Sequence, residues 1–157
     1  AAPSTKWADK SKEQILADIN SAILSVWEAA EYDEEAMPNH ILLPYGQYAH
    51  ILNTMVTDLA GESILDYVLK NNVAAKNGRT LYVGAARWCK GAGTGGTDRM
   101  VVYVNHERFL QVEELVPLAR VMSQPNAAEF CYDTAYAANI SEVELFYPQT
   151  MGYFDGI

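Results

Sequence analysis

The segment 91–96, which contains four glycines, is the part of this chain that most resembles a ligand-binding site. Its letters, Gly91-Ala92-Gly93-Thr94-Gly95-Gly96, match the G-x-G-x-x-G pattern of dinucleotide-binding loops and follow a strand-like segment. In those loops the pattern opens a helix, whose N-terminal amides hold the pyrophosphate. Here the chain runs directly into the β-type segment 100–104 and lacks the Lys-Ser/Thr ending of a P-loop. We therefore predict a flexible loop between two strands that binds no ligand, with nucleotide binding as the minor alternative.

The other residue types that commonly carry chemistry are scattered along the chain. His40, His50 and His106 form no i, i+4 pair of the kind that binds zinc from one helix. No serine lies in a G-x-S-x-G motif, and Cys89 beside Lys90 is expected to be inert. Neighbouring acidic residues are expected to be solvated carboxylates: Glu34-Glu35, Glu113-Glu114, and Glu142 with Glu144. The sequence thus predicts no enzyme, no metal site and no cofactor.

Residues 11–14 carry the sequence signal for the start of a first helix. Ser11 and Gln14 form an S-x-x-Q capping box, in which hydroxyl and amide satisfy the free backbone N–H groups of a helix start. Behind this cap, apolar residues recur at intervals of three and four: Ile15, Ile19, Ala22, Ile23, Val26, Trp27 and Ala30. The pattern predicts an amphipathic helix from Ser11 to about Ala30.

Further elements follow in a mixed order. The segment 39–43, between Pro38 and Pro44, predicts a strand buried on both faces, and Pro44 is expected to open a helix through residue 52. Ser63 is expected to cap a third helix with an apolar face of Ile64, Leu65, Val68 and Leu69. From Thr80 the chain favours strands: 80–85, 99–104, a mixed region over 109–122, and 142–147. This order predicts an α+β fold with helices packed on a mixed or antiparallel sheet.

Composition limits the class of protein. Half of the 157 residues are apolar or aromatic and a fifth are charged, which predicts a folded domain with its own core. No apolar run approaches the roughly 20 residues of a membrane span, and the first residues show no secretory leader, so we interpret the start at Ala1 as a processed or cut chain. The net charge of −9, with no basic cluster, disfavours nucleic-acid binding. Cys89 and Cys131 are expected to be free and buried, as in a reducing compartment.

In their order and spacing these motifs resemble the second half of a tailed-bacteriophage major capsid protein. The fold is that of phage Hong Kong 97, which encapsulins share, and the resemblance is greatest to a branch known as phage-related proteins of unknown function. The segments that carry the resemblance are the helix 15–23, the strand and proline 39–44, the helix 48–52, the run 98–103 and the Phe146-Tyr147-Pro148-Gln149-Thr150 segment.

The resemblance implies a division of the chain and a function. It implies an amino-terminal tail over 1–10, an axial-type capsid domain over 11–120, and strands returning to a peripheral-type domain over 121–157. The arm, extended loop and spine helix of a complete subunit would be missing, so this chain alone is expected to be a monomer or small oligomer. The implied function is that of a self-assembling shell subunit of a phage or prophage, found in the virion and assembled in the cytoplasm of a bacterial host.

The partners implied by the resemblance are copies of the same chain, with no specific nucleic acid, no membrane and no cofactor. The expected contacts between copies lie in the glycine-rich loop and near the carboxyl end: Gly93, Thr94, Gly95, Tyr153 and Phe154. An encapsulin-like nanocompartment shell stays open as an alternative, as does, less strongly, a nucleotide-binding domain that uses the loop 91–96.

Overall fold

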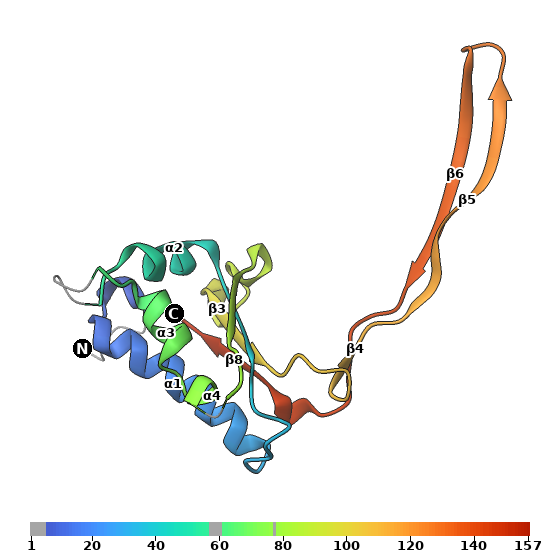
Figure 1. The fold of residues 1–157 in the computed structure, drawn as a ribbon. Coiled ribbons are helices and arrows are strands. Elements are labelled where there is room, and N and C mark those ends of the chain that lie inside the picture. The colour runs from blue at the N-terminus through green and yellow to red at the C-terminus, as the bar shows by residue number, and fades with distance from the viewer. Residues whose placement is uncertain (1–5, 57–60, 77) are drawn as a thin grey trace. The chain divides into compact units, whose positions relative to one another are not determined.

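The computed structural model describes residues 6–56, 61–76 and 78–157, and the chain divides into two compact units (Figure 1). The first unit comprises Ala1–Asn105 and Tyr147–Ile157, and the second comprises His106–Phe146. These boundaries differ from the division at residue 120 that the resemblance implies, and the axial and peripheral assignments remain predictions. Within the described residues, no helix combines the length and apolar character needed to cross a membrane.

The helices of the first unit begin where their sequence signals lie. The α-helices are α1 (Lys12–Ala29), α2 (Tyr45–Asn53), α3 (Ile64–Lys70) and α4 (Val73–Lys76), and the 3-10 helices are η1 (Trp7–Asp9), η2 (Arg87–Cys89), η3 (Thr94–Gly96) and η4 (Pro148–Thr150). The predicted capping box of α1 is confirmed, because the Ser11 amide donates to Gln14 Oε1 at 2.9 Å and the Gln14 amide donates to Ser11 Oγ at 3.4 Å. The predicted apolar stripe is buried at Ile15, Ile19, Ala22, Ile23 and Val26.

The next two helices differ from prediction in detail. Pro44 is the N-cap of α2 and lies one residue before the helix, because its backbone is extended (ψ 151°). Ser63 caps α3 as predicted, accepting the Asp66 amide at 3.1 Å. Leu69, predicted to lie on the apolar face, is exposed. It lies at the edge of a stripe whose centre is formed by the three buried residues Ile64, Leu65 and Val68.

The sheet of the first unit is mixed, in the order β2-β1-β3-β8. Its strands are β1 (His40–Leu43), β2 (Tyr82–Ala85), β3 (Arg99–Tyr103) and β8 (Met151–Asp155). The β1–β2 pair is parallel, whereas β1–β3 and β3–β8 are antiparallel. Strand β8 therefore brings the carboxyl end of the chain beside β3, although residues 106–146 separate them in the sequence.

The core lies on one face of this sheet. Ile41, Leu43, Met100 and Val102 are buried against the apolar stripe of α1, and Trp7 joins them from within the range that the resemblance implies as a tail. The prediction that β1 is buried on both faces is wrong. Its residues alternate between half-buried and buried, because the core covers only the face on which Ile41 and Leu43 lie.

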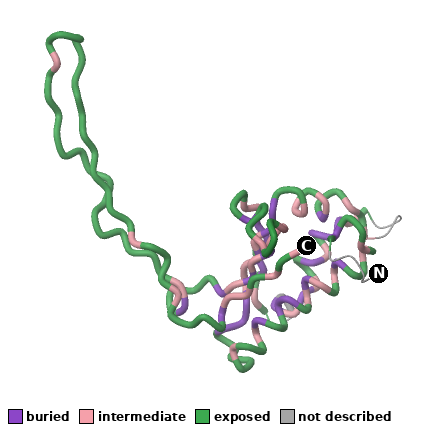
Figure 2. Tube along the Cα trace, turned by 180° about the vertical axis from the view of Figure 1, so that it is seen from behind, coloured by how far each residue is buried: buried purple, intermediate pink, exposed green. Residues whose placement is uncertain are grey.

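The second unit consists of two antiparallel strand pairs. Strand β4 (Leu110–Gln111) pairs with β7 (Glu144–Leu145), and β5 (Glu114–Asn126) pairs with β6 (Cys131–Ile140). We call residues 114–140 the β5–β6 ribbon. Apart from the half-buried Asn126, every residue of the ribbon is exposed (Figure 2).

Candidate functional site

The glycine-rich loop connects β2 to β3 and contains two short 3-10 turns, Arg87–Cys89 and Thr94–Gly96. Strand β3 begins at Arg99, three residues after the last glycine of the run. A dinucleotide-binding loop would open a helix at this point. The loop is therefore a connection between two strands, as predicted.

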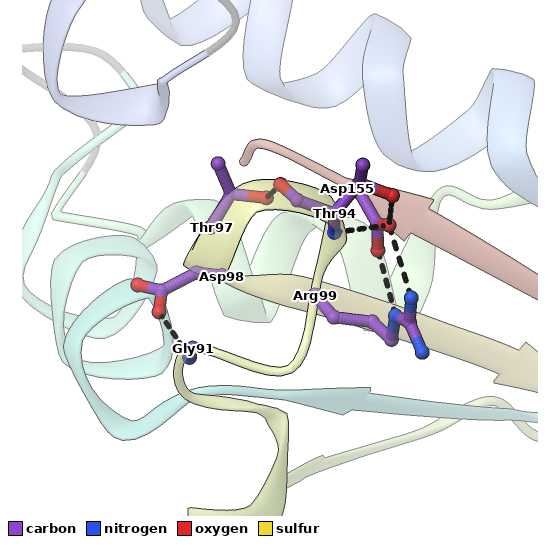
Figure 3. A network of polar contacts seen from close by, with 6 residues as sticks. All are labelled: Gly91, Thr94, Thr97, Asp98, Arg99 and Asp155. Carbon is purple, nitrogen blue, oxygen red and sulfur yellow. Dashed lines mark hydrogen bonds and ion pairs between the residues drawn. The ribbon is translucent and has the colours of Figure 1, made fainter.

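The carboxylate of Asp155, on β8, organises one side of this loop (Figure 3). The Arg99 guanidinium donates to it twice, with Nε at 2.6 Å from Oδ1 and Nη2 at 3.0 Å from Oδ2. The amide and hydroxyl of Thr94 donate to Oδ2 at 2.9 and 3.0 Å. These donors, the Arg99 guanidinium above all, lower the pKa of Asp155 well below its ordinary value. The loop is thus tied to the end of β8 by a charged group.

Asp98 organises the other side. Its Oδ1 accepts the Gly91 amide at 3.0 Å, and its Oδ2 accepts Gln47 Nε2 from α2 at 2.8 Å. The amides of Gly91 and Thr94, which a phosphate would need, thus already donate to carboxylates. These bonds contact the loop at both ends, and its flexibility stays a prediction. Negative charge beside the amides and the missing helix both argue against nucleotide binding.

Two glycines of the loop are required by its geometry. A Cβ at Gly93 would lie 2.6 Å from Thr97 Oγ1 and 2.9 Å from the Thr97 carbonyl oxygen, so no side chain fits without displacing the backbone. Gly95 has a φ of 72°, in the left-handed region that favours glycine. The loop therefore has a defined shape that depends on these two positions.

The two aromatic candidates at the carboxyl end point to opposite sides of the sheet. Tyr153 is exposed, and the Arg99 guanidinium carbon lies 4.8 Å from the centre of its ring. Phe154 is half-buried and packs against the core cluster. The structure therefore brings Thr94 and Tyr153 to the same Arg99–Asp155 pair, while Phe154 supports β8 from the core side.

The sheet face opposite the core carries a row of rings that sequence reasoning missed. His40 lies between Tyr82 and Tyr103 on adjacent strands, with ring centroids 5.0 and 5.3 Å away. Burial of its ring lowers the pKa of His40. In β3, Arg99, Val101 and Tyr103 are half-buried whereas the residues between them are buried, and the apolar sequence of this strand does not show that difference.

The other residues that the sequence raised as candidates for chemistry are the potential metal ligands and the two cysteines. Within the ranges 6–56, 61–76 and 78–157, no three potential ligands gather to hold a metal ion. Cys89 and Cys131 are both free, as predicted, but only Cys89 is buried, because Cys131 lies in the exposed β6. Burial raises the pKa of the Cys89 thiol, which disfavours the reactive thiolate.

Comparison with known families and solved structures identifies proteins that are similar to this chain. A family model described as "Major capsid protein" matches residues 1–157. The chain superposes on a chain of the capsid of Myoviridae phage XM1 with a TM-score of 0.78 and 17% identity, covering 100% of this chain and 50% of that one. It also superposes on the virus-like particle from Pyrococcus furiosus with a TM-score of 0.62 and 14% identity, covering 92% and 52%.

The chain thus spans about half the length of the solved chains that it matches. Among curated proteins no sequence matches it. The two superpositions show the fold, an α+β arrangement similar to that of a phage capsid, and confirm the fold class predicted from the sequence.

Proposed function

This chain belongs to the major capsid protein family, and from that premise we propose that it is a structural subunit that assembles with copies of itself into a closed shell. The observation that carries the proposal is the match of the family model over all 157 residues. The family model and the superposition on a phage capsid with a TM-score of 0.78 favour a phage or prophage capsid over the encapsulin-like alternative. The chain would act through its surfaces and without catalysis.

We propose further that the shell is that of a virion, assembled in the host cytoplasm, and that the two units correspond to two capsid regions. The first unit, with its helices and four-stranded sheet, would form the axial-type domain predicted for 11–120. Residues 106–146 would belong to the peripheral-type part. The compactness of the first unit, which includes the last strand β8, supports this division.

The proposed contacts between neighbouring copies near the capsomer axis are the loop residues Gly93, Thr94 and Gly95 together with Tyr153. Phe154 would act from the core side by fixing β8. Asp155 accepts hydrogen bonds from Arg99 and Thr94, and the Arg99 guanidinium lies over the Tyr153 ring. These contacts support the proposal, because they hold the loop and Tyr153 next to each other.

The test compares the protein expressed from its complete reading frame with the 157-residue chain. Light scattering and electron microscopy should find closed particles for the complete protein. The 157-residue chain should be a monomer or small oligomer, and salt should strengthen its association, because copies with a net charge of −9 repel and 0.1 M salt screens charges beyond about 10 Å. If the complete protein stays monomeric across salt and concentration, the proposal is wrong.

A further inference from the structure

His40 lies at the start of β1, on the sheet face opposite the core, and each of its ring nitrogens has an amide partner. Nδ1 lies 2.9 Å from Asn39 Oδ1, and Nε2 lies 3.2 Å from Asn105 Nδ2. The ring is half-buried between Tyr82 and Tyr103. These two amide contacts determine which ring nitrogen carries the proton.

The orientation of the Asn39 side chain is set by the backbone of Asn105. Asn39 Oδ1 accepts the Asn105 amide at 2.7 Å, and Asn39 Nδ2 donates to the Asn105 carbonyl oxygen at 3.2 Å. The backbone of Asn39 is bonded to both neighbouring strands, since its amide donates to the Tyr103 carbonyl at 3.3 Å and its carbonyl accepts the Tyr82 amide at 2.8 Å. Oδ1 therefore faces the His40 ring in a fixed position and as an acceptor.

This acceptor selects one tautomer of the neutral His40 ring. Because Asn39 Oδ1 can only accept, His40 Nδ1 donates to it and carries the single proton of the neutral ring. Nε2 then has a lone pair, which accepts from Asn105 Nδ2. The neutral ring is thus bonded at both nitrogens, with a donor facing an acceptor in each bond.

A second proton on the ring would enter at Nε2 and break this match. An imidazolium has donors at both nitrogens, so its Nε2–H would face the donor Nδ2 of Asn105. The Asn105 amide would have to turn over or move away. Burial of the ring opposes its charge as well and lowers the pKa of His40. Tyr82 of β2 and Tyr103 of β3 are the titratable groups that face the ring, and tyrosine is neutral near pH 7.

We propose that His40 is a proton-sensitive contact at the end of β3, which holds the Asn105 side chain near neutral pH and releases it on protonation in mild acid. Asn105 is the last residue of the first unit, so the change lies where the chain leaves that unit. Because the folded protein favours the neutral ring, the contact is complete above the ordinary histidine pKa of about 6.5 and is lost as the pH falls through the lower folded-state pKa. The inference does not depend on the shell function.

The tautomer of His40 is the first test. The complete protein, kept as unassembled subunits, is labelled with nitrogen-15, and long-range proton–nitrogen correlation spectra identify the tautomer of each histidine. We expect the Nδ1–H tautomer at His40. His106 is the internal reference, because its Nδ1 accepts the Arg108 amide at 3.1 Å and its neutral ring must carry the proton on Nε2. An Nε2–H tautomer at His40 would overturn the inference.

A pH titration of the same sample tests the release of Asn105. The side-chain amide signals of Asn105 should shift with the same midpoint as the His40 ring, and this midpoint should lie below the ordinary value of about 6.5. Signals of Asn105 that do not follow the ring would show that the two side chains are not coupled, and the proposal would be wrong.

A pair of variants tests the contact from the side of Asn105. Asn105→Ala removes the donor to Nε2 and should raise the midpoint of His40 by about half a pH unit, because a hydrogen bond to the neutral ring is lost. Asn53→Ala, at an exposed position at the end of α2, should leave the midpoint unchanged. Circular dichroism melting checks that both variants are folded. The same midpoint in both variants would contradict the contact, whereas failure to form particles would count only against the proposed function.

Discussion

At the scale of single residues, the Arg99–Asp155 pair determines the shape of the glycine-rich loop. The pair joins β3 to β8, and the same carboxylate accepts the amide of Thr94 from the loop. In a run of glycines that reads like a phosphate-binding loop, a carboxylate of the chain thus accepts the Thr94 amide in the place that an anion would take. The sequence could not predict this, because Thr94 and Asp155 are 61 residues apart.

Asp155→Asn should loosen the loop and lower the melting temperature at pH 7. The folded-state pKa of Asp155 is depressed, so its ionised form stabilises the fold above the ordinary pKa of about 3.9, and this contribution is lost as the pH falls through the folded-state pKa. The difference in melting temperature between the two proteins should therefore shrink as the pH falls below about 4. Glu28→Gln, at an exposed carboxylate of α1, is the control. A difference that does not change with pH would contradict the ion pair.

Gly93→Ala should destabilise the fold by about 1–3 kcal/mol, because the added Cβ meets the backbone and side chain of Thr97 at under 3 Å. Gly46→Ala is the matched control. Nothing lies within 4 Å of a Cβ at Gly46, which is inside α2, so this change should stabilise the fold by about 0.5–1 kcal/mol. Urea denaturation measures both. If the two substitutions have the same sign, the described loop geometry is wrong.

At the scale of elements, the sequence predicted the helix starts, which depend on hydrogen bonds between residues close together in the chain. The start of α1 and the cap of α3 follow from Ser11 with Gln14 and from Ser63, whose hydrogen bonds are local. Strands β6 and β8 were expected only as returning strands of a resembling family. Strand β8 depends on a partner distant in the sequence, with Phe154 opposite Met100, whereas β6 pairs with the adjacent strand β5. The burial of β1 was overestimated for the same reason, since a short apolar run does not reveal whether one or both faces of its sheet are covered.

The stripe of α1 gives a prediction for this scale. Ile23→Ala should destabilise the first unit by about 2–5 kcal/mol, because Ile23 is fully buried in the core. Leu24→Ala, at the next position of the helix and exposed, should cost less than about 1 kcal/mol. Thermal melts followed by circular dichroism compare the two. Equal losses would contradict the orientation of α1 on the sheet.

At the scale of the whole molecule, the two units offer different kinds of surface. The first unit has one continuous core and a sheet face with a row of rings, Tyr82, His40 and Tyr103. The second unit has a ribbon that buries none of its residues. Exposed apolar surface of this extent marks an interaction surface, whereas the net charge of −9 opposes association between copies unless salt screens it.

The central claim is that this chain is the repeating subunit of a shell, and electron cryomicroscopy of the complete protein tests it most directly. The account predicts closed particles whose repeating density fits the β2-β1-β3-β8 sheet with α1 on one face. The absence of particles, or a repeating density that cannot hold this sheet and helix, would contradict it.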